Sequence, residues 1–225
     1  MNRVPSVVSS QPAYGESALS TNKVLRNTYL LLSATLAFSA ATAGIAMAIG
    51  MRPLGLLVTL VGFYGLLFAT MKTRNSAWGL ACVFMLTGFM GLTLGPIVNL
   101  YLKFLPNGGQ VVAMALGTTA VTFVGLSAYA ISSRRNFSFM GGFLTVGVIT
   151  AFILGLVAYF FKMPMLSLAV SGLFTLLMAG VILYQTSEIV HGGETNYISA
   201  TVTLYVSIYN LFTSLLHLFG VASDD

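Results

Sequence analysis

Seven long apolar stretches follow one another along the chain, separated by short polar breaks. Each has about 18 or more mostly apolar residues, close to the ~20 that a helix needs to cross ~30 Å of hydrocarbon. The apolar residues run continuously instead of alternating with a period of two, which favours helices over a β-barrel. The expected spans are 27–50, 54–71, 77–102, 110–132, 138–161, 164–187 and 197–219. The pattern therefore predicts an all-α integral membrane protein, a bundle of seven transmembrane helices.

The composition supports this class of protein. Of the 225 residues, 57% are hydrophobic and 7% are charged, whereas about a quarter of the residues in a soluble domain are charged. The ten Lys and Arg residues occur singly or in pairs between the apolar stretches, so no basic stripe with interleaved aromatic residues indicates binding of nucleic acid. Cys82 is the single cysteine, which excludes an intramolecular disulfide. The lipid bilayer is the expected surrounding of the chain.

Residues 1–22 differ in composition from the apolar stretch that follows them. They are rich in Ser, Pro and small polar residues and lack helical periodicity, which predicts a disordered tail. The tail is too long, and the next stretch too extended, for a cleaved secretory signal. The expected organisation is a tail over residues 1–22 and a seven-helix transmembrane domain over residues 23–225.

The distribution of basic residues predicts which side of the membrane each end of the chain faces. Seven of the ten fall on one side, in the N-terminal segment and in the connectors around residues 72–74 and 134–135. The opposite side has only Arg52, Lys103 and Lys162. By the positive-inside rule, the N-terminus and the connector at residues 188–196 lie in the cytoplasm, and the C-terminus lies across the membrane.

The last two apolar stretches contain the polar side chains that are least expected in a membrane. Ser207, Asn210 and His217 share one face of a helix, and Gln185 and Glu188 of the preceding span could face them. Because unpaired polar groups are costly in hydrocarbon, such residues face a bundle interior, a watery cavity or a partner. Two interpretations stay open. These residues form interhelical hydrogen bonds of ~0.6 kcal/mol each, or they line a path for an ion or proton with weak cation binding.

The connector between the last two spans has polar residues of its own, His191, Gly192, Gly193, Glu194 and Asn196. Glu188 and Glu194 are six residues apart around two glycines, and nothing fixes them as an acid–base pair. His191 and His217 lie at opposite ends of the hairpin, too far apart to share a metal ion. The HExxH, Gly-x-Ser-x-Gly, Walker and GxGxxG motifs are missing from the sequence. We therefore expect a protein that is not an enzyme and that needs no metal or cofactor.

Several segments together resemble one family of membrane proteins. Within residues 87–123 these are GPI at 95–97 and TAVTF at 119–123, and in the last two spans they are YQT at 184–186 and LYVSIYNLF at 204–212. These segments look like the motifs of the Bax-inhibitor-1 (transmembrane Bax-inhibitor-motif) family. The segments KVLRNTY at 23–29 and HGGETNY at 191–197 resemble its bacterial YccA-like branch.

The resemblance implies a seven-helix protein of the bacterial inner membrane, with its N-terminus in the cytoplasm and its C-terminus in the periplasm under the orientation above. The branch is associated with the membrane-anchored ATP-dependent protease FtsH, both as a partner that restrains the protease and as a slow substrate entered through the N-terminal tail. The expected function is therefore modulation of FtsH in membrane-protein quality control, by binding and not by catalysis.

The resemblance also suggests a different function. Other family members are described as calcium leaks gated by two aspartates in the last two spans, and at those positions this chain has Gln185 and Ser207. A pair of carboxyls that shares a proton needs two titrating groups at close range, and neither residue titrates. A calcium or proton leak through the sixth and seventh spans, lined by Glu188, Asn210 and His217, is the alternative function.

Overall fold

The chain folds into helices joined by short connectors. The computed structural model describes residues 14–133 and 135–223, with side chains from Lys23 onward. Its elements are α1 (Tyr14–Ala48), α2 (Leu56–Thr73), α3 (Ala77–Phe104), α4 (Gly108–Ser133), the 3-10 turn η1 (Ser138–Met140), α5 (Gly141–Phe160), α6 (Pro164–Val190) and α7 (Tyr197–Ala222). No strand occurs among the described residues. The predicted all-α class is confirmed.

Seven of these helices are long and apolar enough to cross a membrane, as the sequence predicted. The span within α1 runs from Lys23 to Ala48, but the helix itself begins at Tyr14. No proline interrupts the chain between Pro12 and the end of α1, so residues 14–22 can extend the helix toward the N-terminus. Residues 1–13 lie outside the described residues, and the disorder predicted for the tail stays a prediction there.

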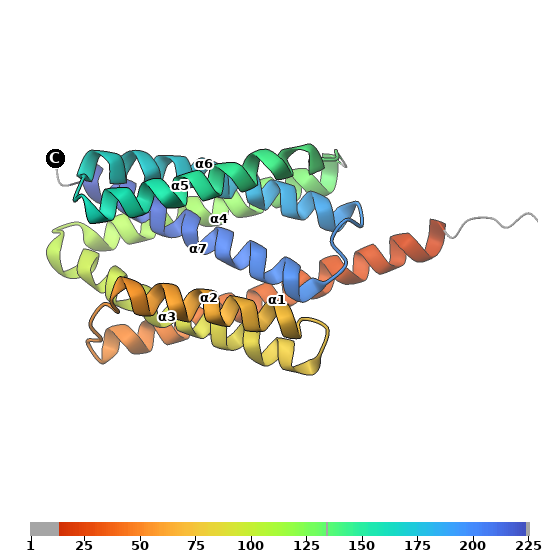
Figure 1. Cartoon of the computed structure of the whole chain (residues 1–225), viewed down its shortest axis with the longest axis horizontal. Helices are drawn as coiled ribbons and strands as arrows, with labels where there is room; N and C mark the ends of the chain where they lie inside the picture. Colours follow the sequence, from red (N-terminus) through yellow and green to blue (C-terminus); the bar gives the residue numbers. More distant parts are fainter. Residues whose placement is uncertain (1–13, 134, 224–225) are drawn as a thin grey trace, which may run out of the picture.

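The helices form two groups of three with α7 between them (Figure 1). In the first group α3 packs against both α1 and α2, and in the second group α6 packs against both α4 and α5. Helix α7 packs against α1, α3, α4 and α6, and it is one of the two most buried spans, together with α3. Both groups therefore enclose the C-terminal helix, which holds the predicted polar positions at the centre of the bundle.

Helices α2 and α5 form the periphery and leave most of their apolar side chains uncovered. Leu57, Val61 and Phe68 of α2 are exposed, as are Phe143 and Val146 of α5. In water such surfaces would cause association, but lipid tails are as apolar as these side chains. The exposed apolar surface is therefore the lipid-facing surface of an integral membrane protein.

Helices α1 and α3 lie close together. Gly91 and Gly95 of α3 face the backbone of α1, where Ser39 O and Ala43 O occupy the space that a Cβ would need. In a membrane, helices associate through dispersion and close packing, and small residues permit the required approach. These glycines therefore allow α1 to lie directly against α3.

Candidate functional site: the α6–α7 hairpin

The connector between α6 and α7 begins with a turn that depends on Gly192. Gly192 has φ +77°, the left-handed conformation that ends many helices. The N–H of Gly193 donates to Glu188 O at 2.8 Å and that of Gly192 donates to Ile189 O at 3.3 Å. These are the two bonds of a Schellman motif, so the two glycines of the connector end α6 and satisfy its last carbonyls.

Substitution of Gly192 by alanine is expected to destabilise the protein by about 1 kcal/mol, because an L-residue pays roughly that cost in the left-handed region. The measurement is equilibrium unfolding in mixed micelles. Gly117→Ala is the matched control, since Gly117 lies inside α4 and a Cβ added there meets no atom within 4 Å. The control is expected to be neutral or slightly stabilising. Equal stability of the two variants would contradict the assignment of Gly192 to the left-handed position of this turn.

Asn196 begins α7 and ties it to another connector. Its Oδ1 accepts hydrogen bonds from the N–H groups of Ile198 and Ser199, both at 3.0 Å, which is a helix N-cap. Its Nδ2 donates to Arg74 O at 3.2 Å and to Asn75 Oδ1 at 2.7 Å. One side chain therefore caps α7 and holds the α2–α3 connector against it.

Ser187 makes the equivalent link to the α4–α5 connector. Its hydroxyl donates to Arg135 O at 3.2 Å and accepts from the N–H of Phe137 at 3.0 Å. His191 Nδ1 lies 2.9 Å from Ser187 O, where the ring N–H donates to the carbonyl. All three connectors at this end of the bundle are thus joined by side chains of the α6–α7 hairpin.

A further bond at this end joins Arg74 Nη1 to Ser199 Oγ at 3.0 Å. Neither this bond nor the hydrogen bonds of Ser187 were predicted from the sequence. A signal for Ser187 was present, because it lies in the same QTSE segment as Gln185 and Glu188. Nothing along the chain indicated which connectors these residues contact.

The three polar positions predicted on α7 have different partners. Ser207 Oγ donates to Thr203 O and Asn210 Nδ2 donates to Val206 O, both at 2.8 Å, so each bonds to the helix's own backbone. His217 Nδ1 lies 2.8 Å from Ser171 Oγ of α6. Of these three side chains, His217 alone forms a hydrogen bond to another helix within the described residues. The three residues share a helix face, as their spacing predicted, but they are not hydrogen-bonded to one another.

The two polar positions on α6 have different environments. Gln185 is buried, and its Nε2 has no hydrogen-bond partner among the described residues. Glu188 is half-buried in the last turn of α6, and its carboxylate covers the Cα of Gly193. A buried N–H donor without a partner is a cost to stability.

Substitution of Gln185 by methionine is expected to leave stability unchanged or to raise it by about 1 kcal/mol, because an unpaired donor is replaced by apolar atoms of similar length. The neighbouring Thr186 is the control. Its buried hydroxyl lies 3.4 Å from Tyr29 OH, so Thr186→Val is expected to cost about 1 kcal/mol. Equilibrium unfolding in mixed micelles tests both. A clear loss of stability in Gln185→Met would show that the amide has a partner in the membrane.

The five predicted polar positions, Gln185, Glu188, Ser207, Asn210 and His217, are not hydrogen-bonded to one another in the part of the chain that the structure describes. Within that same part, no group of three or more His, Cys, Asp or Glu lies close enough to hold a metal ion. What this region does bring together is structural: three connectors, joined through Ser187, Asn196 and Ser199.

Comparison with known proteins agrees with the motifs noted in the sequence. The sequence model of the family described as "Inhibitor of apoptosis-promoting Bax1" matches residues 21–224, nearly the whole chain. The chain belongs to the Bax inhibitor-1 family. The predicted family is thereby confirmed.

Within the Bax inhibitor-1 family, the chain is similar to bacterial inner-membrane proteins. It is 53% identical to "Modulator of FtsH protease YccA" of Escherichia coli strain K12, over 93% of this chain and 94% of the relative. The same identity and coverage relate it to "Inner membrane protein YccA" of Escherichia coli O6:H1. An uncharacterized membrane protein of Vibrio cholerae is 48% identical over 93% of this chain. With its seven spans, the chain is a multi-pass inner-membrane protein of the YccA-like branch.

Proposed function

We propose that the chain modulates an FtsH-type membrane protease in membrane-protein quality control, and that it acts by binding. The observation that carries this proposal is the 53% identity, over nearly the whole of both chains, to a protein named as a modulator of that protease. The connected hairpin supports it, because side chains that hold connectors together suit a rigid binding surface better than a catalytic centre.

The proposal also covers the orientation of the chain in the membrane and the role of its N-terminal segment. The N-terminus and the connector at residues 188–196 face the cytoplasm, and the C-terminus faces the periplasm, on the basis of the positive charges. The start of α1 projects beyond the ends of the other helices (Figure 1). A projecting N-terminal segment on the cytoplasmic side is where a processive protease would engage the chain as a slow substrate.

Two measurements test the proposal. Co-purification from detergent with FtsH is expected for the full chain and for a variant that lacks residues 2–13. Pulse-chase labelling is expected to show slow degradation of the full chain and none of the shortened variant. The control replaces residues 2–13 with a Gly/Ser sequence of equal length, which is expected to restore degradation. If FtsH neither binds nor degrades any version, the proposed function is wrong.

Modulation itself has a separate readout. Added full chain is expected to slow FtsH degradation of another unfolded membrane protein severalfold in reconstituted vesicles, whereas the degradation of a soluble substrate is expected to change less. Equal rates with and without the chain would exclude modulation even if the two proteins bind.

The alternative function, a calcium or proton leak through α6 and α7, gains no support from the geometry. Asn210 and Ser207 bond to their own helix and His217 bonds to Ser171. The named relatives are described as a protease modulator and as inner-membrane proteins. Binding to the protease is the function that the observations favour.

A further inference from the structure

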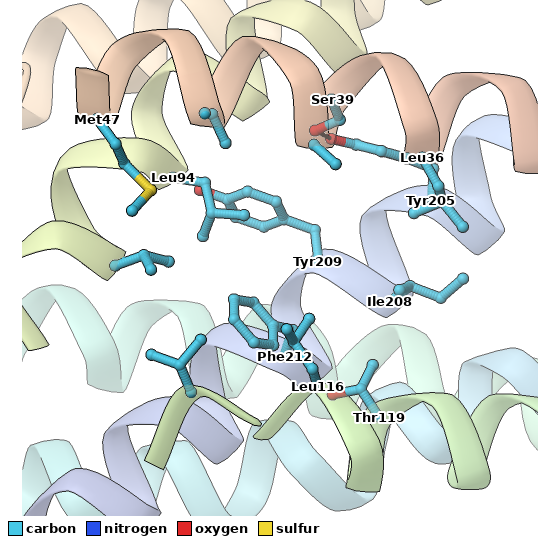
Figure 2. Close-up of a pocket in the computed structure, with 15 residues that line it drawn as sticks. Leu36, Ser39, Met47, Leu94, Leu116, Thr119, Tyr205, Ile208, Tyr209 and Phe212 are labelled. Atoms are coloured by element: carbon cyan, nitrogen blue, oxygen red, sulfur yellow. Dashed lines mark hydrogen bonds between the residues drawn. The ribbon is translucent and has the colours of Figure 1, made fainter. Parts of the chain in front are cut away.

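A mostly apolar cavity of about 420 Å³ lies between α1, α3, α4 and α7. Figure 2 shows Met47 and Leu36 of α1, Leu116 of α4, and Tyr209 and Phe212 of α7 around it. None of the functional residues described above lines this cavity. It is a separate feature of the bundle, referred to below as the α1–α4 groove.

The α1–α4 groove opens toward the lipid between α1 and α4. On α7 the lining residues Tyr205, Ile208 and Phe212 are buried, and Tyr209 is half-buried. The exposed lining residues, Ala40, Gly44 and Leu116, belong to α1 and α4. The opening therefore lies between these two helices, and α7 forms the floor. Since α1 and α4 are membrane spans, the opening faces hydrocarbon.

The polar groups in the groove already have partners. Ser39 Oγ and Tyr205 OH are 2.5 Å apart, and Tyr205 OH donates to Thr87 O at 3.2 Å. Thr119 Oγ1 donates to Ala115 O at 2.7 Å, and Tyr209 OH bonds to Thr93 Oγ1 at 3.1 Å. An ion or polar ligand would find no unsatisfied side-chain group among them. A cavity with this lining favours an apolar occupant over water.

The dimensions of the groove distinguish between apolar occupants. On α1 it is bordered from Leu36 to Met47, which corresponds to roughly 16 Å of helix. That length is about half of the ~30 Å hydrocarbon core, the depth of one leaflet. A partner helix that crosses the membrane would extend along the full ~30 Å, whereas an acyl chain extends over one leaflet. The length of the groove therefore favours an acyl chain.

The position of the groove selects a leaflet. Its lining lies in the second half of the α1 span and the first half of α4, toward the end of the bundle where α1 ends and α7 ends. Arg52 follows α1 at that end, and Lys103 lies in the last turn of α3. Glu188 and Glu194 are at the opposite end, and Asp224 and Asp225, which follow α7, lie outside the described residues. A cationic side chain at the end of the bundle on which the groove lies complements a lipid phosphate group.

We propose that the α1–α4 groove binds one acyl chain of a glycerophospholipid from the leaflet at the C-terminal end of the bundle, with the lipid phosphate near Arg52. The bound chain is a specific ligand of the protein, distinct from the lipid that surrounds α2 and α5. This proposal is independent of the protease function.

Gly44 provides the test variant. It lines the groove, and a Cβ added there meets no atom within 4 Å, so Gly44→Leu is expected to fill the groove without disturbing the helices. Gly65→Leu is the matched control, because Gly65 is exposed on α2 with the same free space and does not line the groove. Thermal unfolding in detergent checks that both variants are folded.

The probe is a phosphatidylethanolamine with a diazirine in one acyl chain, present in nanodiscs of phosphatidylethanolamine and phosphatidylglycerol that hold the purified full chain. After irradiation, the labelled residues are mapped by mass spectrometry. Labelling is expected at Ala43 and Ile208, which are buried beneath the opening. It is expected to fall about tenfold in Gly44→Leu and to stay unchanged in Gly65→Leu, while labelling of exposed Ile153 on α5 is the same in all proteins.

A second experiment tests whether Arg52 interacts with the lipid phosphate. Arg52→Gln is expected to lower groove labelling by the phospholipid probe about threefold and to leave labelling by a diazirine diacylglycerol unchanged. The proposal is overturned if Ala43 and Ile208 are unlabelled in the parent chain, if Gly44→Leu is labelled as strongly as the parent, or if a benzophenone at position 116 captures a second polypeptide instead of lipid.

Discussion

Replacement of Gly95 by leucine is expected to destabilise the protein by about 3 kcal/mol or more, because it forces α1 away from α3. A Cβ at this position would lie 2.5 Å from Ala43 O and 2.7 Å from the Ala46 Cβ, closer than real Cβ atoms approach other atoms. The obstacle includes the backbone of α1, which cannot rotate aside as a flexible side chain can. Equilibrium unfolding in mixed micelles measures the loss.

The control for Gly95 is Gly125→Leu. Gly125 is exposed on α4, and a Cβ added there has no atom within 4 Å. This variant adds the same side chain to a helix of the same bundle without contact, so its stability is expected to equal or slightly exceed that of the parent chain. If both variants unfold at the same denaturant concentration, close packing of α1 on α3 is not a main source of stability.

Substitution of Asn196 by alanine is expected to cost about 2–3 kcal/mol, the second-largest effect among these changes. The variant loses the N-cap of α7, which is typically worth about 1 kcal/mol and at most about 2. It also loses the bonds to Arg74 O and Asn75 Oδ1, each worth about 1 kcal/mol at most in a partly exposed site. The measurements are unfolding in mixed micelles and limited proteolysis of the α2–α3 connector.

Asn196→Asp separates the two contributions. Aspartate caps helices as well as asparagine does, but it cannot donate to Arg74 O or Asn75 Oδ1. The expected cost is therefore about 1–2 kcal/mol, from the lost link alone. Proteolysis of the α2–α3 connector is expected to increase as much in Asn196→Asp as in Asn196→Ala. Protection of the connector in the aspartate variant would show that Asn196 does not hold it.

These links concern function as well as stability. Asn196 and Ser187 join the connectors that follow α2 and α4 to the hairpin of α6 and α7. A partner that binds this end of the bundle would meet one continuous surface formed by all three. Under the proposed orientation this surface is cytoplasmic, the side on which the projecting start of α1 also lies.

Several features could be predicted from the sequence alone. The spans could be located because a backbone amide in hydrocarbon must bond within its own segment, so each crossing needs about 20 consecutive apolar residues. The turn at Gly192 and Gly193 was visible as a break of two glycines, and the family was recognisable from short motifs such as GPI at 95–97. All of these are properties of neighbouring residues along the chain.

The partners of the polar residues were decided by the tertiary structure. Spacing placed Ser207, Asn210 and His217 on one face, yet two of them bond to their own backbone and the third bonds to Ser171. The α1–α4 groove likewise left no mark in the sequence, because its walls come from four helices that are distant along the chain. Hydropathy fixes that a helix crosses the membrane, whereas its rotation and its neighbours follow only from how the side chains of all seven helices pack together.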